Sequence, residues 1–325
     1  MQAVSFEQGQ ACLHERPVPE PEEGEALIRV RLAGICATDL ELLRGYQDFS
    51  GQPGHEFVGH VAGGDIQPDM LGQRVVADIN CGCGTCSWCM HQEPRHCPQR
   101  EILGIKNRDG AFAEYICLPV KTLHLVDGGI PDKEAVLAEP LAAALRVTQQ
   151  MHLTVDLKLA VLGDGTLGIL TALALSRLIP RLTLIGRHAD KLSIAAQQGV
   201  STLRPGPGRE RSGLVGHSNA FDVVIEATGS PQGLDLALDL IRPQGTVVLK
   251  TTTCEPTRLD TSRIAVKEIR VLGSRCGNLD QALLFLRNRW LDLAPLVSGV
   301  YPLAELPAAL EHARSPGSLK VLLSP

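Results

Sequence analysis

The sequence predicts an α/β protein in which a β-rich part is followed by a doubly wound parallel sheet. Three observations predict this fold class. Residues 26–32 alternate apolar and polar side chains, as a half-buried strand does. From about Leu141 onward, short apolar strands alternate with helical patterns, which is typical of a parallel sheet because its crossovers are helices. A glycine-rich turn at 163–168 joins one such strand to a helix.

The composition is that of a globular protein, with 44% hydrophobic and 21% charged residues, and 325 residues suggest about two domains. The net charge is -5 and the basic residues are scattered, so we expect no nucleic-acid partner. No signal peptide is visible, and glycines and charges interrupt the most apolar stretch, 157–179, so we expect no membrane partner. Ten cysteines in such a chain indicate reduced thiols and a cytoplasmic protein.

The first 140 residues contain short β-like runs, each bounded by Gly or Pro. They predict strands at 26–32, 74–77 and 112–118. We therefore expect this part to be a β domain that carries functional loops.

The second part predicts strands and helices in regular succession. The expected strands are 158–162, 182–185, 221–227 and 246–249, and the expected helices are 167–178, 191–198 and 234–241. About the last 45 residues contain two helical patterns and a terminal strand at 319–323.

Four cysteines lie in a loop-like stretch with the spacing C-x2-C-x2-C-x7-C, namely Cys83, Cys86, Cys89 and Cys97. Three close thiols and a fourth at loop distance can surround one ion tetrahedrally, as a structural zinc site requires. Two disulfides are a weaker alternative because a reducing compartment disfavours them. An iron–sulfur cluster is also weaker, because the last cysteine of the ferredoxin run follows more closely. We therefore expect a structural zinc.

The turn at 163–168 fits the G-x-G-x-x-G dinucleotide motif. It follows a predicted strand and opens a predicted helix, which distinguishes it from a merely tight turn. Its glycines permit close approach of a pyrophosphate, which the helix N-terminus then faces. We expect cofactor contacts from Gly163, Gly165, Thr166, Leu167 and Gly168.

The end of the second strand of this unit selects between two cofactors. An acidic residue there would bind the ribose 2′-hydroxyl of NAD. The sequence instead has Gly186, Arg187 and His188. Glycine would leave room, and Arg187 can pair with a 2′-phosphate, unless it is only a solvated loop charge. We expect these three residues at the cofactor and favour NADP(H) over NAD(H).

Cys36, His55 and Glu139 are candidate ligands of a second metal ion. A catalytic zinc uses three protein ligands and keeps one position open. Taken singly, each residue has another explanation: a buried thiol, a core histidine or a carboxylate at the start of a helix. Their occurrence together with the cysteine cluster and the glycine-rich turn favours a metal site.

With these motifs in order, the chain resembles the zinc-dependent alcohol dehydrogenase family of the medium-chain dehydrogenases/reductases. The matching segments are 34–39, 54–59, 83–97, 138–141, 163–168, 223–229 and 318–321. The resemblance implies a GroES-like domain at 1–140 and 278–325, a Rossmann domain at 141–277, and a homodimer or homotetramer. It also implies hydride transfer between NAD(P) and a small alcohol or polyol, or the corresponding aldehyde or ketone, with one catalytic and one structural zinc.

The resemblance further implies roles for single residues. Cys36, His55 and Glu139 would hold the catalytic zinc, with Glu56 as an alternating ligand. Asp39 would orient the His55 imidazole, and Thr38 would contact the substrate oxygen and begin a proton relay. Two residues, Thr228 and Lys320, would lie at the cofactor, with Lys320 beside its phosphates unless it is a surface lysine.

The sequence also departs from the family pattern. Glu41 stands where many alcohol dehydrogenases have a relay histidine, so it either carries a proton or is a surface residue. The chain is short for the family, so the substrate is not predicted beyond its class. Two alternatives remain at this point: a zinc-independent quinone or enoyl reductase of the same fold, and a non-catalytic dinucleotide-binding protein with structural zinc.

Overall fold

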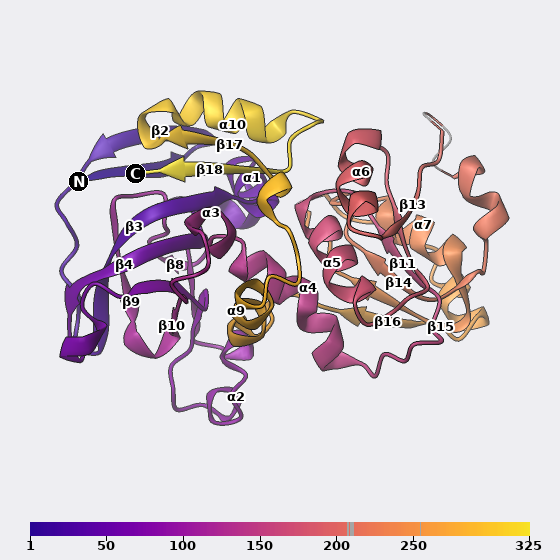
Figure 1. Ribbon diagram of the computed structural model, residues 1–325, viewed down its shortest axis with the longest axis horizontal. Helices are drawn as coiled ribbons and strands as arrows, with labels where there is room; N and C mark the ends of the chain where they lie inside the picture. The colour runs from indigo at the N-terminus through magenta and orange to yellow at the C-terminus, as the bar shows by residue number, and fades with distance from the viewer. Residues whose placement is uncertain (207, 209–210, 254) are drawn as a thin grey trace. The chain divides into compact units, whose positions relative to one another are not determined.

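The structure is a computed structural model that describes residues 1–206, 208, 211–253 and 255–325. The chain divides into two compact units, residues 1–139 with 279–325 and residues 140–278 (Figure 1). Each bound lies one residue from the domain limit expected from the sequence.

The first unit is built around a mostly antiparallel sheet with the strand order β10-β5-β4-β3-β18-β17, in which β9 also pairs with β3. Its strands are β3 (Glu25–Ile35), β4 (Glu56–Gly64), β5 (Arg74–Ala77), β9 (Tyr115–Pro119), β10 (Leu123–Leu125), β17 (Val297–Pro302) and β18 (Lys320–Ser324). Ala26, Ile28 and Val30 of β3 are buried whereas Arg29 and Arg31 are exposed, as their alternation predicts. Because β18 pairs with β3, the C-terminal segment completes the sheet of the first unit.

Smaller elements complete this unit. Two strands, β1 (Gln2–Glu7) and β2 (Gln10–Glu15), form a hairpin, and a short sheet contains β6 (Asn80–Cys81), β7 (Glu101–Leu103) and β8 (Asn107–Arg108). The helices are α1 (Ala37–Leu43), α2 (Ser87–Met90), α3 (Asp132–Ala135), α9 (Leu279–Arg287) and α10 (Leu306–Arg314). Helix α10 lies over β17 and β18 (Figure 1).

The second unit has a parallel sheet with the order β13-β12-β11-β14-β15-β16. Its strands are β11 (Leu159–Leu162), β12 (Leu182–Ile185), β13 (Ser201–Leu203), β14 (Phe221–Glu226), β15 (Ile241–Leu249) and β16 (Arg270–Gly273). Its helices are α5 (Thr166–Ser176), α6 (Ala189–Gln197), α7 (Gly233–Leu240) and α8 (Ser262–Val266), preceded by α4 (Ala138–Gln150). The sheet order reverses direction at β11, so the predicted doubly wound fold class is confirmed.

Helix α5, which follows the glycine-rich turn, is apolar on every side. Residues 168–175 of this helix are all buried, which explains hydrophobic residues on every side of it. Most elements differ from their expected bounds by a few residues, and two strands begin at clearly different positions. Strand β9 begins at Tyr115 instead of 112, and β15 begins at Ile241 instead of 246.

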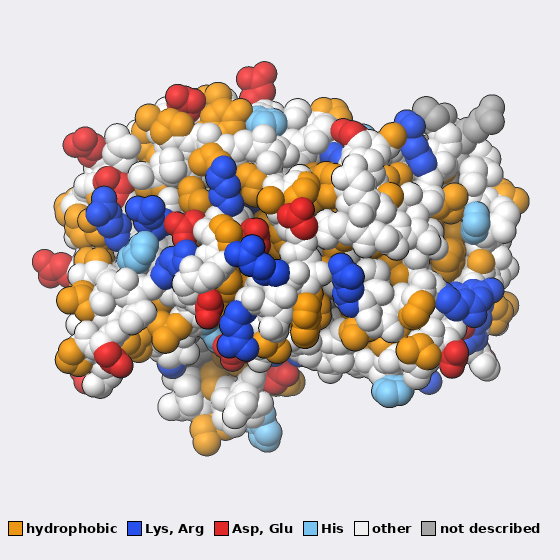
Figure 2. All heavy atoms as spheres, in the orientation of Figure 1, with side chains coloured by type: hydrophobic (Ala, Val, Ile, Leu, Met, Phe, Trp, Pro, Cys, Tyr) orange, Lys and Arg blue, Asp and Glu red, His pale blue; other side chains and the backbone are white. Residues whose placement is uncertain are grey.

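On the face drawn in Figure 2, the described Lys and Arg side chains are interspersed with Asp and Glu, as the scattered charges of the sequence predict. Within the described residues, no helix has the length and apolar character needed to cross a membrane.

Candidate metal centres and dinucleotide site

Two strand ends bring the candidate catalytic ligands together. Strand β3 stops just before Cys36, and β4 starts just after His55. Gly34 of β3 pairs with Glu56 of β4, so Cys36 and His55 leave the sheet at neighbouring positions. One candidate ligand atom from each of Cys36, His55 and Glu56 lies within 4.8 Å of the other two. A thiolate, an imidazole and a carboxylate form a donor set that fits zinc.

Helix α1 places Asp39 against this cluster. Cys36 is the N-cap of the helix, and its backbone N–H donates to Asp39 Oδ2 at 2.8 Å. Asp39 Oδ1 lies 3.2 Å from His55 Nδ1, in the position expected of a residue that orients the imidazole. Burial alone would lower the pKa of His55, but Asp39 and Cys36 raise it well above its usual value. The cluster therefore favours positive charge, as a cation site does.

Glu139 is not among the close ligand atoms of this cluster. It is half-buried in the first turn of α4, and the cluster found among the described residues does not include it. Burial raises the pKa of Glu139 to about 7, and the charges of His55 and Glu56 act on it in opposite directions. Glu56 takes the closer place because it is the β4 residue that pairs with Gly34 at the end of β3. Ligation by Glu139 stays a prediction.

The remaining predicted residues of this site have distinct surroundings. Thr38 is half-buried in the first turn of α1. The Glu41 carboxylate pairs with Arg44 at 2.8 Å along the same helix and its side chain is 17% exposed, so its choice between a proton carrier and a surface residue stays open. Lys320 Nζ lies 2.5 Å from Glu56 Oε2 and donates to the Ile35 carbonyl oxygen at 3.1 Å. Its observed partner is thus a carboxylate of the ligand cluster, and its expected contact with a cofactor phosphate stays a prediction.

The cysteine cluster is held by the short sheet of the first unit. Asn80 and Cys81 of β6 pair with Ile102 and Glu101 of β7, so the loop between these strands is closed at its base. The sulfur atoms of the four predicted ligands lie within 4.8 Å of one another, and all four are free thiols. Hydrogen bonds from Thr85 and from the Cys86 N–H lower the pKa of Cys83 to about 6, whereas burial raises the pKa of Cys89 to about 11. Without a metal the cluster therefore favours a thiolate at Cys83 alone of these two residues. The donor set fits a closed tetrahedral zinc site.

The glycine-rich turn has the geometry of a phosphate-binding turn. Gly163 has a φ of +120°, and a Cβ there would come within 2.4 Å of the Ala227 carbonyl oxygen. A Cβ at Gly168 would come within 2.0 Å of the Gly163 carbonyl oxygen, so this glycine permits close packing of helix α5 on the turn. A Cβ at Gly165 would meet no atom within 4 Å, which leaves the turn open where a pyrophosphate would approach.

A cavity within the second unit opens at this turn. Of the residues predicted to bind cofactor, its lining includes Gly163, Gly165, Gly186, Arg187 and Thr228. Thr166, Leu167 and Gly168 form the first turn of α5 directly behind it, and His188 is the N-cap of α6. The sequence reasoning missed other lining residues, among them Asp164, Pro205, Leu214, Ser230 and Leu236. Most are apolar or small residues without a recognisable motif, but Asp164 lies inside the glycine motif and could have been noticed.

The surroundings of Gly186 show what lies beside it. A Cβ at Gly186 would come within 2.5 Å of Asp164 Oδ2, so Asp164 occupies the direction that a side chain would take. Gly186 also lines the cavity, and the room that it would leave for a 2′-phosphate stays a prediction.

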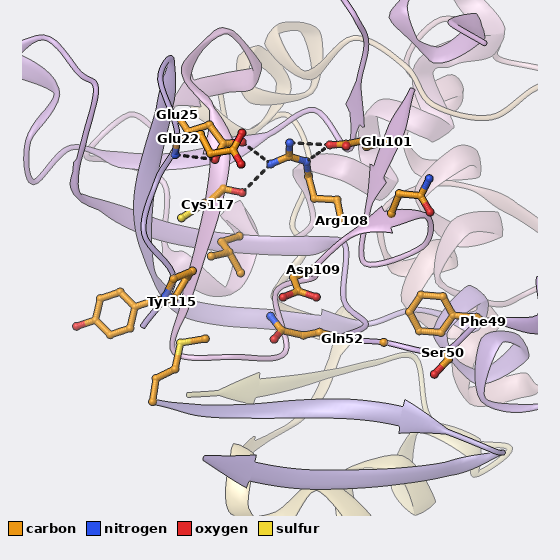
Figure 3. A pocket seen from close by; sticks show the side chains of 15 residues that line it. Glu22, Glu25, Phe49, Ser50, Gln52, Glu101, Arg108, Asp109, Tyr115 and Cys117 are labelled. Atoms are coloured by element: carbon orange, nitrogen blue, oxygen red, sulfur yellow. Dashed lines mark hydrogen bonds and ion pairs between the residues drawn. The ribbon is translucent and has the colours of Figure 1, made fainter. Parts of the chain in front are cut away.

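A separate cavity of about 490 Å³ lies in the first unit (Figure 3). The Arg108 guanidinium points between Glu25 and Glu101, and it donates to them and to the Cys117 carbonyl oxygen. Arg108 lies in β8, Glu101 in β7 and Glu25 in β3, so these bonds join the sheet that holds the cysteine cluster to the main sheet. Because its central charges are paired with one another, we interpret this region as structural.

Comparison with known proteins agrees with this arrangement. Residues 22–128 match the family model described as an alcohol dehydrogenase GroES-like domain, and residues 168–298 match the zinc-binding dehydrogenase model. D-altritol 5-dehydrogenase of Agrobacterium fabrum is 32% identical over 99% of this chain and 98% of its own.

Two solved structures share the fold over the whole chain. A short chain alcohol dehydrogenase from Escherichia coli CFT073, complexed with NADH, is 26% identical with a TM-score of 0.88, covering 100% of this chain and 99% of that one. A putative zinc-binding dehydrogenase from Sinorhizobium meliloti 1021, bound to NADP, is 28% identical with a TM-score of 0.87 and the same coverage.

The second unit carries a dinucleotide turn on a doubly wound sheet, and the first unit carries a cluster of sulfur, nitrogen and oxygen ligands. These two features define a zinc-dependent oxidoreductase of the NAD(P) type. The chain belongs to the zinc-dependent alcohol dehydrogenase family of the medium-chain dehydrogenases/reductases, as its motifs predict.

Proposed function

We propose that this protein is a polyol or alcohol dehydrogenase that favours NADP(H) and holds two zinc ions per chain. The observation that carries the proposal is the strand register that places Cys36, His55 and Glu56 together at one edge of the sheet. The polyol class is supported by the similarity to an enzyme named for D-altritol. The two alternatives, a zinc-independent reductase and a non-catalytic protein, are not favoured because this ligand cluster is present.

The residues of the cluster have separate tasks in this proposal. Zinc, when bound, supplies a Lewis acid that lowers the pKa of a substrate hydroxyl. Cys36 and His55 would hold it, with Glu56 or Glu139 as the carboxylate ligand. Asp39 keeps the His55 ring oriented through its Nδ1. The Thr38 hydroxyl would accept the substrate proton and pass it outward.

The cofactor would bind along the glycine-rich turn in the second unit. Its pyrophosphate would face Gly165 and the start of α5, where the backbone N–H groups and the helix dipole favour negative charge. Arg187 is exposed at the rim of the cavity and would attract a 2′-phosphate, which favours NADP(H). The strength of this preference also depends on the neighbouring Asp164.

Metal content and turnover test the proposal together. Purified protein should contain two zinc ions per chain and should oxidise polyols with NADP or NAD, followed at the nicotinamide absorbance. Cys36→Ser and His55→Ala should each lose one zinc and at least about a hundredfold in turnover, because ligand removal disables the Lewis acid. The exposed Cys12→Ser and His152→Ala are matched controls that should change neither. Full turnover in the ligand variants would contradict the proposal.

The second zinc can be tested separately at the buried Cys97. Cys97→Ser should lose the other zinc and lower the unfolding temperature, because a structural zinc contributes folding free energy. A wild-type content of one zinc per chain, bound at the cysteine cluster and without turnover, would support the non-catalytic alternative instead.

We also propose that the protein is a cytoplasmic homodimer or homotetramer. A reducing compartment would keep the zinc-binding cysteines as thiols. Light scattering after gel filtration should give two or four times the chain mass of 34.9 kDa, and a monomer would contradict the assembly proposed here.

A further inference from the structure

Asp164 has an unusual place in the glycine-rich turn. Its carboxylate is almost buried, at 7% exposure, yet it belongs to the lining of the cavity. Asp164 Oδ2 accepts the backbone N–H of Arg187 at 2.6 Å and that of His188 at 2.7 Å. His188 Nδ1 lies 3.1 Å from both carboxylate oxygens. The turn after β11 is therefore tied through one carboxylate to the turn after β12.

The same carboxylate fills the space that a side chain would take at Gly186, the residue just after β12. A Cβ built on Gly186 would lie 2.5 Å from both Cβ and Oδ2 of Asp164. Asp164 and a larger residue at position 186 are therefore mutually exclusive in this backbone. The carboxylate that other dinucleotide sites present from the end of the second strand is thus presented here from the glycine-rich turn.

This arrangement changes what the cavity can bind. Backbone N–H groups that follow a strand are natural ligands for a phosphate, but those of Arg187 and His188 are already satisfied by Asp164. A 2′-phosphate would gain the exposed Arg187 guanidinium and would face the Asp164 charge beneath it. Lys191, a residue with 8% exposure, is a further cation that interacts with Asp164. A ribose 2′-hydroxyl, by contrast, can donate to the carboxylate.

We propose that Asp164 weakens the preference for NADP(H) by accepting the 2′-hydroxyl of NAD(H) and opposing the 2′-phosphate of NADP(H), against the attraction of Arg187. The inference rests on the proposed dinucleotide site. Asp164 is then the residue whose charge limits the preference for NADP(H).

Binding to the metal-loaded full chain tests the inference without turnover. Calorimetric titration with NADH and NADPH gives a ratio of dissociation constants for each variant. Asp164→Asn keeps the size of the side chain and its acceptor oxygen but removes the charge. It should shift this ratio toward NADPH roughly tenfold. Asp190→Asn removes an exposed carboxylate from the first turn of helix α6 and should leave the ratio unchanged, whereas Arg187→Met should shift it toward NADH.

The possible results separate the two proposals. If wild-type protein binds neither nucleotide, the proposed dinucleotide site is wrong. If wild-type protein binds both nucleotides but Asp164→Asn and Asp190→Asn have the same ratio of dissociation constants, the dinucleotide site stands and the role of Asp164 is overturned. Adenosine 2′,5′-bisphosphate and AMP are fragment probes that should show the same shift, because they differ by the 2′-phosphate alone.

A position swap provides a stability measurement that needs no cofactor. Gly186→Asp alone should lower the unfolding temperature by roughly 5 °C, because the new side chain meets Asp164. Asp164→Gly added to it removes the Asp164 Cβ as well as the carboxylate, so it should recover at least half of that loss. It should also keep the NADH-to-NADPH ratio within about threefold of wild type, since the carboxylate has moved but not disappeared. A double variant no more stable than Gly186→Asp would overturn the mutual exclusion.

Discussion

Lys320 Nζ lies 2.5 Å from Glu56 Oε2, and both side chains are almost completely buried. The pairing follows from the sheet: Val321 of β18 is opposite Ile35 of β3, and Glu56 of β4 is opposite Gly34 on the other side. Lys320 and Glu56 therefore meet across the end of β3. A buried ammonium at this place offsets one carboxylate of the ligand cluster and keeps it directed away from solvent.

Replacing Lys320 by methionine should destabilise the protein strongly. Glu56 would be left as a buried charge without its partner, and breaking such a pair costs about 3–5 kcal/mol. Urea unfolding of Lys320→Met measures the loss. The double variant Glu56→Gln/Lys320→Met removes both charges and should be clearly more stable than the single variant, and equal stabilities would contradict a coupled pair.

The same variant tests the predicted contact of Lys320 with the cofactor. If the lysine serves only Glu56, the dissociation constant of NADPH should change less than about threefold in folded Lys320→Met protein. A loss of affinity of tenfold or more would support the phosphate contact that the sequence implies.

Gly34 should be essential for the close packing of Lys320 and Glu56. A Cβ there would come within 2.6 Å of Glu56 Oε2 and 3.3 Å of Lys320 Cδ. Gly34→Ala should lower the free energy of unfolding by roughly 1–3 kcal/mol, because both partners must move. Gly63→Ala is a matched control in β4, where an added Cβ meets nothing within 4 Å. A loss in the control as large as in Gly34→Ala would argue against a steric cause.

Much of this architecture can be predicted from the sequence because its signals are local. The strands around 26–32 and 182–185 follow from alternation and from a short apolar run, and the cysteine spacing alone indicates the metal cluster. The glycine motif becomes specific because a strand precedes it and a helix follows it.

The rest depends on contacts that the sequence does not contain. Lys320 and Glu56 are 264 positions apart and meet only through the pairing of β18 and β4 with β3. Gly186 suggests free space until the Asp164 side chain is seen to occupy it. Glu56, and not Glu139, is among the close ligand atoms because of the register between β3 and β4. No pattern in a single sequence specifies that register.

Arg108 should be a major link between the cysteine-cluster sheet and the main sheet. It donates to Glu25 at 2.7 Å and to Glu101 at 2.6 Å, and its side chain is 17% exposed. Arg108→Met should destabilise the protein by about 2–3 kcal/mol, since it leaves the buried Glu25 without a cation. Arg16→Met breaks the more exposed pair with Asp109 and should cost about 1 kcal/mol or less. Denaturant unfolding of both variants distinguishes a central link from an ordinary surface pair.

His124 should make stability depend on pH in a defined direction. It lies between Asp280 of helix α9 and Asp78, at 2.7 Å and 3.2 Å. Burial alone would lower the pKa of His124, but the hydrogen bonds to both carboxylates outweigh it and raise the pKa. A raised pKa means that the folded state holds the proton more tightly than the unfolded chain, whose histidine pKa is about 6.5. The stabilisation is therefore fully present below that value and is lost as the pH rises through the folded-state pKa.

Comparing His124→Gln with wild type at two pH values measures this contribution. The variant should lose roughly 1–2 kcal/mol of unfolding free energy at pH 6 and distinctly less at pH 9, because the imidazolium that holds α9 to the sheet is absent at high pH in both proteins. The exposed His152→Gln should show no such pH-dependent difference. If the loss of unfolding free energy in His124→Gln grew with pH, neutral His124 would be the stabilising form. The protonation of His124 would then weaken, and not strengthen, its contact with helix α9.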